Sequence, residues 1–125
     1  MLVATIISIL ILIMLGAFQF ALASGKPFGE FAWGGQHKVL PNKLRIASIL
    51  SIFIYLVIIV CLLSKSGLYQ IIPKGMLLDV LVWLILAYFM LGIFLNAISP
   101  SNSEKYAMTP ISIILSSCVL IIAIA

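Results

Sequence analysis

Four long apolar stretches alternate with short polar segments along the chain. The stretches cover residues 2–23, 46–63, 76–98 and 110–125, and Asp79 is the single charged side chain within them. A helix crosses the hydrocarbon core of a bilayer with about 20 apolar residues, so this pattern is typical of membrane spans. The sequence therefore predicts an all-α fold, a small transmembrane four-helix bundle built as one domain from residues 1–125.

Small or weakly polar residues recur at helical spacing on one face of several spans. Thr5, Ser8 and Gln19 share a face of the first span, Ser48, Ser51 and Tyr55 share a face of the second, and Ser112 and Ser116 share a face of the fourth. Helices in lipid use such faces for close packing and for hydrogen bonds between helices. These faces are expected to point into the bundle.

Local signals place the ends of several spans. Lys65 and Gly67 favour a helix end after the second span. Thr109 and Pro110 suit the cap and first residue of the fourth helix, although the short fourth stretch leaves open a start nearer Tyr106. Residues 21–24 resemble a signal-peptidase site, but no basic segment precedes the first stretch, which is also longer than the usual ~7–15 residue signal core. The first stretch is expected to remain as a span.

The loop at residues 24–45 concentrates the polar chemistry of the chain. It holds four of the seven basic residues, the only histidine and four of the eight glycines. Its glycines could expose backbone N–H groups to an anion, and His37 could transfer a proton near neutral pH. The alternative is structural, because aromatic and lysine side chains beside spans anchor the membrane interface. The candidate binding residues are Lys26, Glu30, Trp33, Gly34, Gly35, Gln36, His37 and Lys38.

Three polar residues inside the apolar stretches are further candidates. Ionisable residues in spans point to function, but Asp79 lies only one turn into its helix, where the helix dipole also favours a negative charge. Its expected partner is Lys74. Gln19 is expected to bond another helix or a headgroup, and Asn96 lies near the end of the third span, off the stripe that contains Asp79.

Composition limits the classes of function. With 65% hydrophobic and 8% charged residues, the chain lacks the roughly 25% charged residues of a soluble domain. The net charge of +4 is assigned to loops that meet anionic headgroups, so no nucleic-acid partner is expected. Cys61 and Cys118 have neither metal-ligand spacing nor a basic neighbour. No catalytic residue, metal or cofactor is predicted.

The charge of the loops predicts the topology. The first and third loops carry five basic residues and the second carries Lys65 and Lys74. The positive-inside rule then places loop 24–45 in the cytoplasm and both termini outside the cell membrane.

The run GKPFGEFAWGGQHKVLP, followed by Lys43-Leu44-Arg45 and a span that contains serines, resembles small bacterial integral membrane proteins of four helices that have no assigned activity. The resemblance implies a bacterial origin and four spans, and it assigns no role to any residue. The expected function is that of a non-enzymatic accessory subunit or a small transporter or channel component. Its partners would be the lipid bilayer and either further copies of the chain or a larger membrane complex. The alternative is a lipid- or quinone-binding protein or enzyme that uses the loop at 25–45.

Overall fold

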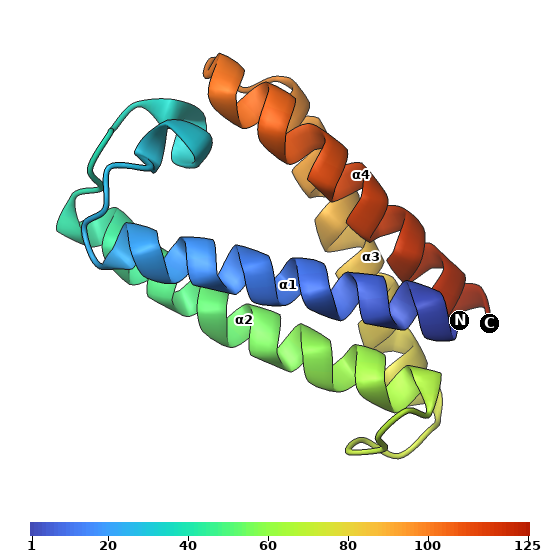
Figure 1. Cartoon of the computed structure of the whole chain (residues 1–125). Helices are drawn as coiled ribbons and strands as arrows, with labels where there is room; N and C mark the ends of the chain where they lie inside the picture. Colours follow the sequence, from blue (N-terminus) through green and yellow to red (C-terminus); the bar gives the residue numbers. More distant parts are fainter.

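The computed structural model describes all residues from 1 to 125 and is entirely helical (Figure 1). Two short 3₁₀ turns, η1 and η2, lie between the first two long helices. The elements are α1 (Leu2–Ala23), η1 (Gly29–Phe31), η2 (Trp33–Gly35), α2 (Asn42–Ser66), α3 (Met76–Ala97) and α4 (Asn102–Ile124).

Each of the four α-helices is long and apolar enough to cross a membrane, with 22, 25, 22 and 23 residues in chain order. At 1.5 Å per residue these lengths match a hydrocarbon core about 30 Å thick. Only 25 of the 125 residues are buried, and large apolar side chains on all four helices face outward. Such a surface suits lipid and not water, so the chain is a multi-pass membrane protein and the predicted four-helix bundle is confirmed.

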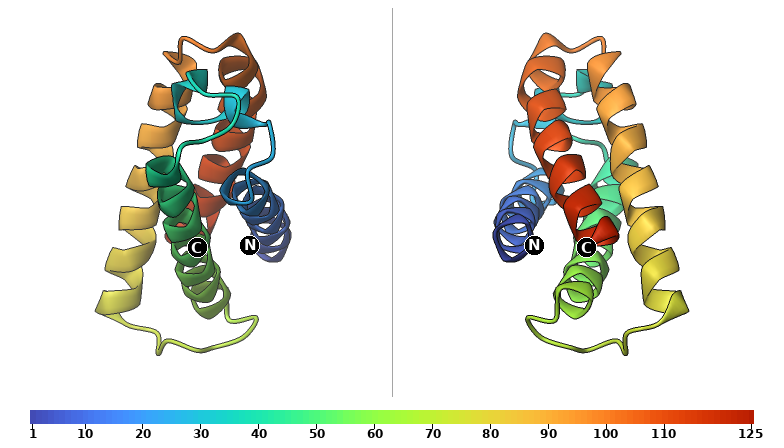
Figure 2. Two further views of the ribbon diagram at one scale, coloured as in Figure 1. Left: turned by 90° about the vertical axis from the view of Figure 1, so that its left-hand side faces the viewer. Right: turned by 90° about the vertical axis from the view of Figure 1, so that its right-hand side faces the viewer.

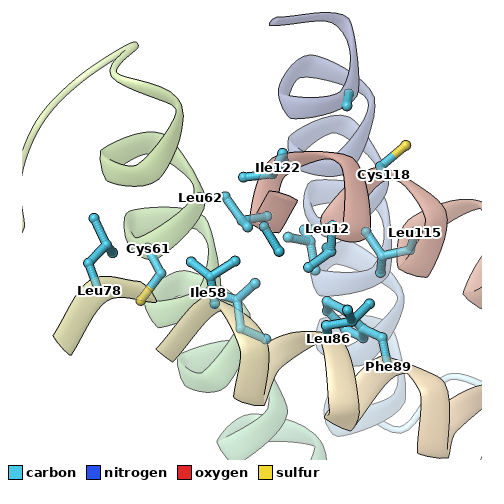
Figure 3. Close-up of a cluster of buried hydrophobic side chains, with 14 residues drawn as sticks. Leu12, Ile58, Cys61, Leu62, Leu78, Leu86, Phe89, Leu115, Cys118 and Ile122 are labelled. Atoms are coloured by element: carbon cyan, nitrogen blue, oxygen red, sulfur yellow. The ribbon is translucent and has the colours of Figure 1, made fainter. Parts of the chain in front are cut away.

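The helices form two antiparallel pairs, with α1 along α2 and α3 along α4 (Figure 1). Contacts of α4 with α1 and of α3 with α2 join the pairs. Figure 1 shows the pairs close together near the two chain termini and farther apart toward the segment between α1 and α2. The hydrophobic core lies in the closer half (Figure 3), with Leu12, Ile58, Leu86 and Ile122 among its members.

The predicted polar faces point inward. Thr5 and Ser8 are fully buried, and their hydroxyl groups donate to the carbonyl groups of Met1 and Ala4 at 2.9 and 2.8 Å. These bonds satisfy the hydroxyl groups within the helix, so that two small side chains can pack against neighbours without an unpaired donor.

The start of α4 corrects the prediction of a helix that begins at Pro110. The helix begins at Asn102, and Pro110 lies inside it. Ser101 is the cap, because its side chain accepts a hydrogen bond from the backbone N–H of Glu104. Proline inside a helix removes one backbone hydrogen bond, and the cap together with the packing of the helix overrides that loss. Thr109 is therefore not a cap.

The second helix covers Asn42–Ser66 and so extends beyond its predicted range of 46–63. The mostly polar residues at both ends continue the helical backbone conformation. Its end agrees with the sequence signal. Gly67 adopts the left-handed conformation with φ of 79°, and Lys65 lies in the last turn, as expected where glycine ends a helix.

Candidate functional site

The segment at residues 25–41, hereafter the capping loop, folds over the wider end of the bundle. Figure 2 shows it beside the connection from α3 to α4. Gly29 closes the loop, since its N–H donates to the carbonyl of Lys38 at 2.9 Å. A Cβ atom at Gly29 would lie 1.8 Å from the carbonyl oxygen of His37. Only glycine therefore allows the two halves of the loop to come this close.

A tight left-handed turn brings the middle of the capping loop into contact with α2 and α4. Trp33, Gly34 and Gly35 have φ values of 53°, 77° and 69°. Positive φ is unusual for tryptophan, and two contacts accompany it here. The indole Nε1 of Trp33 donates to the hydroxyl of Ser48 at 3.3 Å, and the N–H of Gly34 donates to Oε2 of Glu104 at 3.2 Å.

Ser101 connects the capping loop to the cap of α4. Its hydroxyl donates to the backbone carbonyl of Glu30 while it accepts from the N–H of Glu104. Gly35 packs against the same serine, because a Cβ on Gly35 would lie 2.3 Å from Cβ of Ser101. The first and third loops thus meet at one end of the bundle.

Arg45 holds the base of the capping loop. Its Nε donates to the carbonyl of Leu40 at 2.9 Å. The guanidinium group also covers Gly25, where a Cβ would lie 2.9 Å from one of its nitrogens. This contact assigns Arg45 a structural role beside its contribution to the charge of the loop.

A cavity of about 670 Å³ lies beneath the capping loop, between the two helix pairs. Its wall is mostly apolar and takes residues from all four helices and from η1 and η2. The polar side chains of the wall are Gln19, Trp33, Ser51, Tyr55, Tyr88, Asn96, Ser99, Glu104 and Ser112.

The polar groups of the cavity differ in how well they are satisfied. Asn96 donates from Nδ2 to the hydroxyl of Ser112 at 2.8 Å, which joins α3 to α4. The Oε1 atom of Gln19 is buried and has no hydrogen-bond partner. An unpaired buried acceptor is unfavourable by about 1–3 kcal/mol. Because the protein covers this atom, it does not face the open space of the cavity.

No family model matches the chain, and comparisons with curated proteins and with solved structures found no match. The resemblance to small bacterial four-helix membrane proteins stays a prediction.

The structure separates the eight candidate residues of the loop into three groups. Trp33 and Gly34 line the cavity, and Glu30 and Gly35 contact Ser101. The remaining four have exposed side chains outside the cavity wall: Lys26, Gln36, His37 and Lys38. The side chain of Glu30 is exposed as well, since its backbone makes the contact.

Asp79 lies at the opposite end of the bundle and pairs with Lys65, not with the expected Lys74. Lys65 is in the last turn of α2 and Asp79 is in the first turn of α3, so the two side chains face each other across the linker. The side chain of Asp79 is 51% exposed, and exposed ion pairs contribute about 0–1 kcal/mol. Asp79 therefore does not join Gln19 and Asn96 at the cavity.

Glu104 is the one carboxylate of the cavity, and the sequence interpretation did not identify it. It is only 6% exposed and lies in the first turn of α4. The pattern Ser101-x-x-Glu104 is a capping-box signature and could have placed a helix start there. In the structure the carboxylate bonds Gly34 of the capping loop, and no local sequence pattern predicts that contact.

Proposed function

We propose that this membrane protein binds an amphipathic small molecule taken from the bilayer, as a non-enzymatic accessory subunit or small transporter component. The observation that carries the proposal is the cavity of about 670 Å³, whose mostly apolar wall includes the polar side chains of Gln19, Asn96 and Glu104. Binding sites for small molecules measure about 300–1,000 Å³ and combine a mostly apolar wall with a few polar groups.

The arrangement of the wall suits a ligand with two chemically different parts. Leu15, Phe89 and Leu115 offer an apolar surface that is continuous with the core. The end of α3 with Asn96, the start of α4 with Glu104 and the capping loop lie toward the wider end. An amphipathic molecule would place its apolar body between the helix pairs and its polar part below the capping loop.

The same arrangement favours binding over catalysis. His37 is exposed and outside the cavity wall, and the wall contains no histidine, cysteine, lysine or arginine. Glutamate, tyrosine and serine can also act as acid, base or nucleophile, but these catalytic modes need such groups within hydrogen-bond reach of one another. The carboxylate of Glu104 bonds only the backbone N–H of Gly34. Of the alternative function, the binding of a lipid or quinone is therefore retained and the enzymatic activity is not. The capping loop would cover the bound molecule.

We also propose that the capping loop faces the cytoplasm and that both termini lie outside, in a bacterial cell membrane. The five basic residues of the first and third loops support this orientation. A cysteine that replaces Lys38, whose side chain is exposed, should resist a membrane-impermeant maleimide in intact cells and react after permeabilisation. Labelling in intact cells would contradict this orientation and place the capping loop outside the cell.

Filling the cavity tests the binding proposal. Gly92 lines the cavity, and a Cβ built there meets no atom within 4 Å. Gly92→Leu should therefore fold normally and occupy part of the cavity. In a Trp83→Phe background Trp33 is the single tryptophan, and a brominated octanol should quench its fluorescence saturably in nanodiscs. Gly92→Leu should abolish the saturable component.

Gly16→Leu is the matched control. Gly16 also has no atom within 4 Å of a built Cβ, but it lies outside the cavity wall, so its saturable quenching should equal that of the parent protein. Quenching that is linear in all three proteins, as expected from collisions within the bilayer, would contradict a binding site in the cavity.

A further inference from the structure

The cavity contains one carboxylate, and the protein supplies no cation to it. Glu104 is only 6% exposed and lines the cavity wall. Its Oε2 accepts the N–H of Gly34 at 3.2 Å, while Oε1 makes no hydrogen bond. The positive end of the α4 dipole offsets part of the negative charge. One oxygen of a buried carboxylate is thus left for another donor.

No lysine or arginine lines the cavity, and none forms an ion pair with Glu104. The one ion pair of the protein joins Lys65 to Asp79 at the far end of the bundle. Lys105 follows Glu104 in the sequence, but its ammonium group lies 5.6 Å from the centre of the Tyr106 ring, and both residues border a separate groove beside Pro110. A carboxylate that is largely shielded from water and has no cation beside it is left uncompensated, so a positively charged ligand would gain from pairing with it.

Aromatic rings supply the second contribution to cation binding. Six aromatic residues line the same cavity: Phe18, Phe31, Trp33, Tyr55, Tyr88 and Phe89. The face of an aromatic ring attracts a cation, and the attraction grows when water is excluded. The carboxylate and the rings therefore favour the same sign of charge on the ligand.

We infer that the ligand of this cavity is a lipophilic cation, whose positive group pairs with Glu104 beneath the capping loop. This inference rests on the proposed function and specifies its ligand class. The apolar wall selects for lipid solubility, and Glu104 selects for positive charge.

Two ions of nearly equal shape and opposite charge test the inference. Tetraphenylphosphonium and tetraphenylborate are measured by equilibrium dialysis against the protein in nanodiscs, with empty nanodiscs subtracted. The wild-type protein should bind tetraphenylphosphonium saturably and about tenfold or more tighter than tetraphenylborate. Glu104→Gln keeps an oxygen for the N–H of Gly34 and removes the charge, so it should weaken tetraphenylphosphonium binding by about tenfold or more.

Glu30→Gln is the matched control, because this acid lies in the capping loop with an exposed side chain outside the cavity wall. It should bind tetraphenylphosphonium as the wild type does. Equal affinity for the two ions, or Glu104→Gln with unchanged affinity, overturns the inference. If Glu104→Gln does not fold, the comparison of the two ions on the wild-type protein decides.

The two proposals fail in different ways. Saturable quenching of Trp33 by the brominated octanol without preference for the cation would leave the binding function standing and remove the ligand class. Absence of saturable binding for the alcohol and for both ions would overturn both proposals.

Discussion

Replacing Gly29 by alanine is expected to release the capping loop from the bundle. The added Cβ would lie 1.8 Å from the carbonyl oxygen of His37 and 2.8 Å from that of Lys38. Both atoms belong to the backbone, so no side-chain rotation relieves the overlap. Overpacking is unfavourable by about 1–3 kcal/mol, and a backbone clash at this distance belongs at the upper limit. The population of molecules with an open capping loop would then increase by about a hundredfold.

Quenching of Trp33 by iodide in a Trp83→Phe background measures this release. The indole should become more accessible as it leaves Ser48. Gly16→Ala is the control, since no atom lies within 4 Å of its built Cβ, and alanine in a helix is neutral or stabilising by up to about 1 kcal/mol. Equal iodide quenching in the Gly29→Ala and Gly16→Ala proteins would contradict the loop closure described here.

Replacing Gly35 by alanine should be the second large perturbation, for two reasons that add. The φ of 69° is unfavourable for a residue with a Cβ by roughly 1–2 kcal/mol. The added atom would also lie 2.3 Å from Cβ of Ser101, which contributes about 1–3 kcal/mol more. Thermal unfolding, followed by circular dichroism in a mild detergent, should show the combined loss.

Two variants separate the two contributions at Gly35. Gly34→Ala carries only the backbone contribution, since φ is 77° but no atom lies within 4 Å of the built Cβ. Ser101→Gly removes the side-chain atoms that Gly35→Ala would meet. Its own cost is a few tenths of a kcal/mol at the helix cap together with the lost hydrogen bond to the carbonyl of Glu30. The double variant Gly35→Ala/Ser101→Gly should therefore be more stable than the sum of the single changes. Strict additivity would exclude the contact between the capping loop and α4.

The four spans could be predicted from the sequence because lipid imposes a simple pattern. A helix in hydrocarbon must satisfy its own backbone and present apolar side chains outward, so a long uncharged stretch is sufficient evidence. The start of α4 could not be found in this way. Most of residues 102–109 are polar or charged, and the cap at Ser101 lies before a proline that normally marks a helix start. The capping box at Ser101 and Glu104 was the stronger signal.

The site could be predicted only in part, because it depends on contacts between distant segments. The composition of the loop indicated Trp33 and Gly34, and the cost of polar groups in lipid indicated Gln19 and Asn96, all of which line the cavity. The contact between Gly34 and Glu104 joins residues 70 positions apart. No periodicity links such a pair, and the folded arrangement of η1, η2 and α4 is needed to find it.

Native mass spectrometry of the wild-type chain, released from nanodiscs that were formed from its own membrane, shows whether the cavity holds a ligand. The spectrum should show the chain, as a single copy or as an oligomer, with a small molecule of defined mass bound to each copy. Gly92→Leu should lose that mass, and Gly16→Leu should retain it. Wild-type protein with no bound mass, or a bound mass that Gly92→Leu retains, would contradict a ligand site in the cavity.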